Sequence, residues 1–148
     1  MRGIRPFVSG LAGACGLEVA HRVMRRLTDD APRVDALGKH TVKEVFDRLG
    51  IDAPQGNTLY STALAGEIIT NSLYFSQIGG RRGMPTLLKG LNLGVMAGVG
   101  AIFVPQKVGL GKEPLAKSAK TALLTVGLYA FGGLCAGLMA QLLPGKSS

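Results

Sequence analysis

The sequence has few charged residues and few residues that bind metals. Asp, Glu, Lys and Arg make up 18% of the 148 residues, whereas soluble domains carry about 25%. Two cysteines and two histidines form no cluster with the spacing of a zinc site. No Ser or Cys has a His placed to activate it as a nucleophile. The composition therefore favours no enzyme class, and it predicts neither a metal nor a cofactor.

The net charge of +8 raises the question of a nucleic-acid partner, because clustered Lys and Arg neutralise phosphates. The basic residues are not interleaved with aromatic ones, however, and they concentrate in loops beside apolar stretches. In that position they fix orientation in a membrane and meet anionic lipid headgroups. The bilayer is therefore the predicted partner, and nucleic acid is not.

Four apolar stretches are predicted to cross a membrane as helices, at about 6–24, 57–79, 84–105 and 121–143. Residues 121–145 carry no charge, 53–80 carry only Glu67 and 83–106 carry only Lys89. A helix needs about 20 apolar residues to cross the hydrocarbon core. The first stretch is the weakest, and a cleaved signal, with a faint lipoprotein motif ending at Cys15, is a less favoured alternative, as is a mitochondrial presequence. The sequence predicts one all-α domain over 1–148, an integral membrane bundle of four transmembrane helices.

Most Lys and Arg residues lie in or beside the first loop, 25–56, and the third loop, 106–119. Cytoplasmic loops are enriched in Lys and Arg. Both long loops are therefore predicted to be cytoplasmic, although the Arg81-Arg82 pair in the second loop argues the other way.

A short amphipathic helix at about 42–49 is predicted within the first loop. Thr41 and Glu44 have the spacing of a capping box, and Gly50 is placed to end the helix. Upstream, Asp30 is placed to cap a single helical turn that ends near Gly38. The apolar residues recur at helical spacing on one face: Val42, Val45, Phe46 and Leu49. This face is expected to cap the bundle or to lie at the bilayer interface.

Small residues recur every four positions in the last two predicted spans. Such rows allow two helices to approach closely in a membrane. The third span contains a glycine zipper, and the fourth contains the same spacing and a parallel row of small residues. The zipper positions are Gly90, Gly94, Gly98, Gly133 and Gly137, beside the row Gly132, Ala136 and Ala140. Packing of the third span on the fourth is predicted, and a homo-oligomeric interface is the alternative.

The second predicted span carries a polar face. Tyr60, Glu67, Asn71 and Tyr74 lie at offsets that place them on one side of a helix. A carboxyl group near the middle of a bilayer is a candidate functional group. At a rise of about 1.5 Å per residue, Glu67 lies about 15 Å from the first-loop side and Asn71 about 21 Å.

Partners for these polar residues are predicted from their depths. Glu18 and His21 lie at depths from which they line one pathway with Glu67, whereas Asn92 is at the depth of Asn71, which predicts an amide pair. Glu18 and His21 also have the spacing of di-iron bundles, but pairing of Glu18 with Arg22 is the favoured interpretation.

Two runs of the sequence, Asp30-Ala31-Pro32-Arg33-Val34-Asp35 followed by Gly38, and Asn71-Ser72-Leu73-Tyr74-Phe75, resemble those of a group of small, uncharacterised multi-pass proteins of the bacterial inner membrane. The resemblance implies the architecture and the location. It implies no activity or ligand for any residue.

Two functions are compatible with these observations. The abundance of packing motifs favours a structural or assembly module that docks against itself or against a larger membrane complex. The alternative is a small transporter or oligomeric channel that uses Glu67, with Glu18 and His21 as auxiliary groups.

Overall fold

The computed structural model describes residues 4–80, 85–109 and 113–143, and in these ranges the chain forms helices and turns with no strand. The elements are α1 (Ile4–Leu27), α2 (Val34–Arg48), α3 (Gly56–Phe75), a 3₁₀ helix η1 (Ser76–Gly80), α4 (Thr86–Lys107), α5 (Glu113–Ala116) and α6 (Ala119–Leu142). The all-α prediction is confirmed. The Arg81-Arg82 pair, which bears on orientation, lies outside the described residues.

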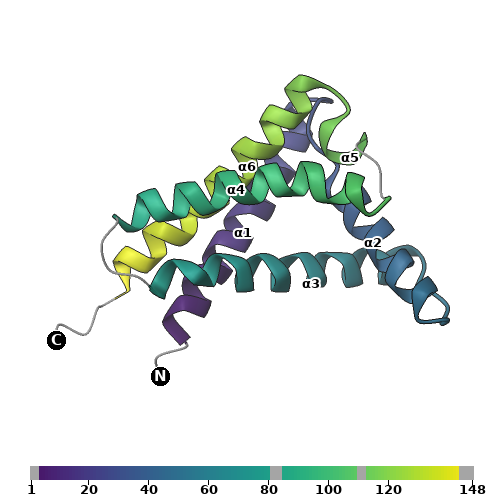
Figure 1. Ribbon diagram of the computed structural model, residues 1–148, viewed down its shortest axis with the longest axis horizontal. Helices are drawn as coiled ribbons and strands as arrows, with labels where there is room; N and C mark the ends of the chain where they lie inside the picture. The colour runs from purple at the N-terminus through teal and green to yellow at the C-terminus, as the bar shows by residue number, and fades with distance from the viewer. Residues whose placement is uncertain (1–3, 81–84, 110–112, 144–148) are drawn as a thin grey trace.

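The long helices α1, α3, α4 and α6 run alternately in opposite directions (Figure 1). The start of α1 and the end of α6 lie at one end of the molecule, and α2 and α5 lie at the other. Helix α6 packs against both α4 and α1, and α3 packs mainly against α1. The predicted spans therefore correspond to the four long helices, with the third-span and fourth-span helices in extensive contact.

Two of these helices, α4 and α6, are long and apolar enough to cross a membrane. Helices α1 and α3 are also long, but they carry more polar side chains than α4 and α6 do. The part of the four-span prediction that the described residues confirm is thus the helical bundle and two candidate spans. In the most apolar window of α4, 17% of the residues are buried within the chain, so most of this helix faces outward.

The backbones of α4 and α6 are in direct contact at their glycines. A Cβ atom added at Gly94 would lie 2.7 Å from the Cα of Ala130, and one added at Gly98 would lie 2.7 Å from the Cα of Val126. Gly90 faces Gly133 in the same way. These positions allow a close antiparallel approach because they have no side chain. The glycine rows in the two helices therefore face each other within one chain.

The parallel row of small residues on α6 faces α1. A Cβ atom at Gly13 would lie 2.8 Å from the Cβ of Ala136 and 2.8 Å from the carbonyl oxygen of Gly132. Cys135 lies beside Gly16, and both Cys135 and Cys15 are free thiols. Small residues on α6 therefore serve two neighbours, one on each side of the helix.

The first loop differs from its prediction. The helix predicted at 42–49 is the second half of α2, which runs without a break through Gly38. Thr41 does not cap it, because its Oγ1 donates to the Leu37 carbonyl 2.9 Å away, and the α2 N-cap is Arg33 rather than Asp30. The capping-box prediction was wrong because a local sequence motif carries no information about the tertiary contact at Gly38, through which the helix continues.

The predicted end of α2 is confirmed. Gly50 has φ of +70°, and its N–H donates to the Asp47 carbonyl at 3.0 Å, while Ile51 N–H donates to Phe46 at 3.1 Å. This pair of bonds is a Schellman motif. The apolar side chains of Val45 and Leu49 stay exposed, so the second half of α2 does not cap the bundle.

Residues 113–119 of the third loop pack against the bundle. Leu115 in α5 is buried, and its carbonyl accepts a hydrogen bond of 2.8 Å from the Thr125 hydroxyl. Thr121 Oγ1 donates to the Asp30 carbonyl at 2.9 Å. These two threonines attach both loops to the start of α6.

Candidate functional site

A cavity of about 350 Å³ lies between α1, α2 and α3. Its walls carry three carboxylates, three guanidinium groups, one imidazole and one phenol. The lining residues are Glu18, His21, Arg22, Arg25, Arg26, Asp35, Tyr60, Ala63, Leu64 and Glu67. We refer to it as the α1–α3 cavity. It brings together Glu18, His21 and Glu67, the three residues that depth along the helices predicted to line one pathway.

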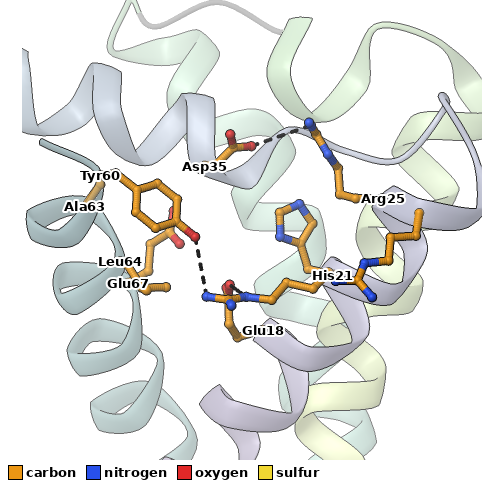
Figure 2. A pocket seen from close by; sticks show the side chains of 10 residues that line it. Glu18, His21, Arg25, Asp35, Tyr60, Ala63, Leu64 and Glu67 are labelled. Carbon is orange, nitrogen blue, oxygen red and sulfur yellow. Dashed lines mark hydrogen bonds and ion pairs between the residues drawn. The ribbon is translucent and has the colours of Figure 1, made fainter. Parts of the chain in front are cut away.

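The cavity exists because the side chains between α1 and α3 are small near one end of the helix pair and long near the other. Near one end, Gly10 lies so close to the Ser72 carbonyl that a Cβ atom would not fit. Toward the other end, the long side chain of Arg22 spans the gap, with its Nη2 atom 3.4 Å from the Tyr60 hydroxyl. The helices are therefore in backbone contact at one end. At the other end polar side chains separate them, and Figure 2 shows the cavity there.

Two ion pairs in the cavity originate on α1. Arg22 Nε lies 2.7 Å from Glu18 Oε1, one helical turn away, which confirms the predicted pairing. Arg25 Nη1 lies 3.6 Å from Asp35 Oδ1 on α2. This distance is too long for a hydrogen bond, and Asp35 Oδ1 is buried without a hydrogen-bond partner among the described residues.

His21 has a structural contact. The side chain is 6% exposed, and Nε2 lies 2.9 Å from the Pro32 carbonyl oxygen. A carbonyl oxygen only accepts hydrogen bonds, so Nε2 carries the proton in this contact. His21 thereby ties the end of α1 to the turn before α2 and forms part of the cavity wall.

Glu67 lies at the contact between α3 and α2. Its carboxylate faces the Cα of Gly38, where the structure leaves no space for a Cβ atom. Within the described ranges, no ion pair or hydrogen bond joins Glu67 to another side chain, although it shares the cavity with three arginines. The side chain is partly buried. Gly38 is therefore required for close packing beside Glu67, which its interpretation as a helix terminator missed.

The remaining predicted polar residues lie away from the cavity. Tyr74 donates a 2.8 Å hydrogen bond to the Leu93 carbonyl of α4. Asn92 is exposed, and among the described residues no hydrogen bond joins it to Asn71. The predicted amide pair is wrong because α3 contacts α4 mainly near the end of α3, where Tyr74 reaches the Leu93 carbonyl.

Several cavity residues were not predicted as site residues. Arg25 and Arg26 were interpreted only as orientation signals, and Asp35 as part of the first loop. No local pattern marks Asp35, because only the packing of α2 on α3 brings it to the cavity. Charged side chains recurring at Glu18, Arg22 and Arg25 on one face of α1 were the available signal.

The α1–α3 cavity gathers polar and charged side chains from three helices. It combines fixed acids, fixed bases and hydrogen-bonding groups, and its lining includes no Ser or Cys nucleophile. In the described part of the chain, no group of His, Cys, Asp and Glu side chains is arranged to hold a metal ion. The mixed charge suits a polar ligand that carries both signs of charge.

Comparison of the chain with protein-family models, with curated proteins and with solved structures gives no match in any of the three. The resemblance to small bacterial membrane proteins stays a prediction. The function is therefore argued from the fold and the α1–α3 cavity.

Proposed function

We propose that this chain is a small multi-pass protein of the bacterial inner membrane in which α1, α3, α4 and α6 all cross the bilayer. The observation that carries the proposal is the contrast between the two sides of α4. Its glycines face α6, whereas Leu88, Met96 and Phe103 are exposed. Large exposed apolar faces need lipid or protein against them.

The function that this architecture supports best is that of a structural or assembly module within the membrane. The glycine-zipper rows are occupied by the α4–α6 contact, so they hold the subunit together. Docking to a second copy or to a larger complex then uses the outward faces. On α3 this face includes Ile69 and Leu73, both exposed, and Gly66, which has open space beside it.

The test is purification from native membranes in mild detergent, followed by intact-complex mass spectrometry. An assembly module is expected to retain a stoichiometric partner or further copies of itself. Replacing the outward Ile69 and Leu73 by Ala should release that partner while leaving the helical content and melting temperature of the subunit unchanged. Recovery of a lone monomer at native expression levels would contradict the assembly function.

A transporter or channel is the second candidate, and the gathering of Glu18, His21 and Glu67 in one cavity supports it. In proteoliposomes, a Glu67→Gln variant should abolish a proton-coupled flux. The matched control is Glu44→Gln, which changes an exposed carboxylate paired with Arg48. Equal flux in the two variants would exclude Glu67 as a coupling group.

A further inference from the structure

Within the α1–α3 cavity, one acidic and one basic side chain have no ion-pair partner among the described residues. Glu18 is paired with Arg22, and Asp35 lies near Arg25. In the described parts of the chain, Glu67 and Arg26 have no ion-pair partner, although both line the cavity. The cavity thus carries a carboxyl group on α3 and a guanidinium group on α1 that have no ion-pair partner among the described residues.

These two groups differ in exposure. Glu67 is partly buried against α2, beside Gly38 and Ala63. Arg26 is exposed, near the end of α1. A partly buried carboxylate favours a cationic hydrogen-bond donor, because burial without a partner is costly. Guanidinium groups near the opposite end favour a phosphate, which they bind through paired N–H donors.

The cavity has the size of a small-molecule site. At about 350 Å³, it falls at the lower end of the range of roughly 300–1,000 Å³ for ligand pockets. Asp35 Oδ1 lies 3.6 Å from Arg25 Nη1 but accepts no hydrogen bond among the described residues, so it adds a second acceptor for N–H groups. Lys39 lies over the Tyr60 ring, with Nζ 5.5 Å from the ring centroid, and adds positive charge beside the cavity.

We propose that the α1–α3 cavity binds a phosphoethanolamine group, with its primary ammonium at Glu67 and its phosphate at Arg25 and Arg26. Within a membrane the source of this group is the headgroup of an aminophospholipid. The choice of a lipid source rests on the proposed membrane location. A primary ammonium offers three N–H donors. A headgroup without an amine has no such donors, and a quaternary ammonium has no N–H at all.

The test compares three phospholipids with identical acyl chains, added to the delipidated protein in detergent: phosphatidylethanolamine, phosphatidylglycerol and phosphatidylcholine. Retained lipid is counted by intact mass spectrometry, and the shift in melting temperature is measured in parallel. Phosphatidylethanolamine is expected to bind at least tenfold more tightly than the other two. Equal binding of the three lipids would overturn the proposal.

Two variants separate the two ends of the ligand. Glu67→Gln should remove the preference for phosphatidylethanolamine over phosphatidylglycerol, because the amide no longer offers a negative charge to the ammonium. Arg26→Gln should weaken the binding of both lipids several-fold. The matched controls are Glu44→Gln and Arg48→Gln, which break an exposed ion pair elsewhere and should leave all binding unchanged. Retention of the preference in a folded Glu67→Gln protein would overturn the proposal.

Soluble phosphoethanolamine distinguishes failure of the site from failure of the membrane location. If this compound raises the melting temperature of the wild type but not that of Glu67→Gln, the site is supported even if the protein is recovered without detergent. If neither the compound nor the lipid raises the melting temperature, the proposed site is overturned. Membrane extraction would then test the location independently.

Discussion

Thr121 shows how one hydroxyl group joins distant parts of the chain. The residue is fully buried, and its Oγ1 lies 2.9 Å from the Asp30 carbonyl and 3.1 Å from the Ser118 hydroxyl. It therefore connects the start of α6 to the turn between α1 and α2.

Replacement of Thr121 by Val keeps the shape but leaves the Asp30 carbonyl without this donor. We expect a loss of about 1–3 kcal/mol of unfolding free energy, the usual effect of an unsatisfied polar group. Thermal unfolding in detergent measures it. The control is Thr62→Val, because Thr62 makes only a local bond to the Thr58 carbonyl and its replacement should change stability by less than about 0.5 kcal/mol. Equal effects of the two variants would contradict the role of Thr121.

Asp30 predicts a pH dependence in the same region. The Lys120 ammonium lies 2.8 Å from its carboxylate, and this hydrogen bond and charge hold the Asp30 pKa below its usual range. A lowered pKa means that the pair stabilises the fold above about pH 4, the ordinary pKa of Asp, and that this stabilisation is lost as the pH falls through the folded-state value.

The melting temperatures of wild type and Asp30→Asn should therefore differ at pH 7, and the difference should shrink as the pH falls below about 4. The difference is expected to be small and to shrink in 1 M salt, because the pair is solvent-exposed. If the difference in melting temperature is unchanged at pH 3, the ion pair is not its cause.

Among the elements, the α4–α6 pair depends on its glycines. In a Gly94→Ala variant, the new methyl group would meet the backbone of Tyr129 and Ala130. Because backbone cannot rotate away as a side chain can, we expect a loss of about 1–3 kcal/mol. Gly100→Ala on the same helix has open space and should leave stability unchanged or slightly higher. Thermal unfolding of both variants checks this, and equal melting temperatures would contradict the contact.

The α2–α3 contact depends on Gly38 in a different way. A Cβ atom there would meet the Glu67 carboxylate and lie 3.3 Å from the Ala63 Cβ. In Gly38→Ala we expect faster amide exchange across residues 34–48, with α6 unaffected, because the first half of α2 must move away from α3. Gly66→Ala, with open space beside it, is the control. Unchanged exchange in α2 would show that Glu67 rotates aside without cost.

Element by element, the sequence predicted the parts that depend on local patterns. The four long helices and the Gly50 terminus follow from apolar stretches and from one glycine. The unbroken course of α2 through Gly38 did not, because a glycine that ends a helix and one that admits a neighbour look alike in a sequence. The cavity was predicted in part, through Glu18, His21 and Glu67, whereas Asp35 depends on how α2 folds back.

At the scale of the whole molecule, the proposed crossings decide on which side of the bilayer each turn lies. If all four long helices cross, the turn at Asp52 and the turn at Val108 lie on the same side. The fold brings the two turns together, because Asp52 and Gly109 line one surface pocket at the end of the molecule that holds α2 and α5.

We expect cysteines at Asp52 and Val108, each introduced into a Cys15→Ala, Cys135→Ala protein, to react with a membrane-impermeant maleimide from the same side of oriented vesicles. Positive charge in both loops predicts that this side is the cytoplasm. Both positions are exposed, so poor access does not explain a lack of labelling. Labelling of the two cysteines from opposite sides would exclude the four-span topology.

By itself, the sequence determined that the chain forms long apolar helices with glycines at four-residue spacing, because these properties belong to local composition and to helical periodicity. Only the tertiary structure decided which of the two small-residue rows on α6 meets α4, that α6 serves both α4 and α1, and that α2 brings Asp35 into the cavity with Glu67. Those outcomes depend on contacts between residues far apart in the chain, where the fit of side chains against backbone selects among pairings that periodicity leaves equal.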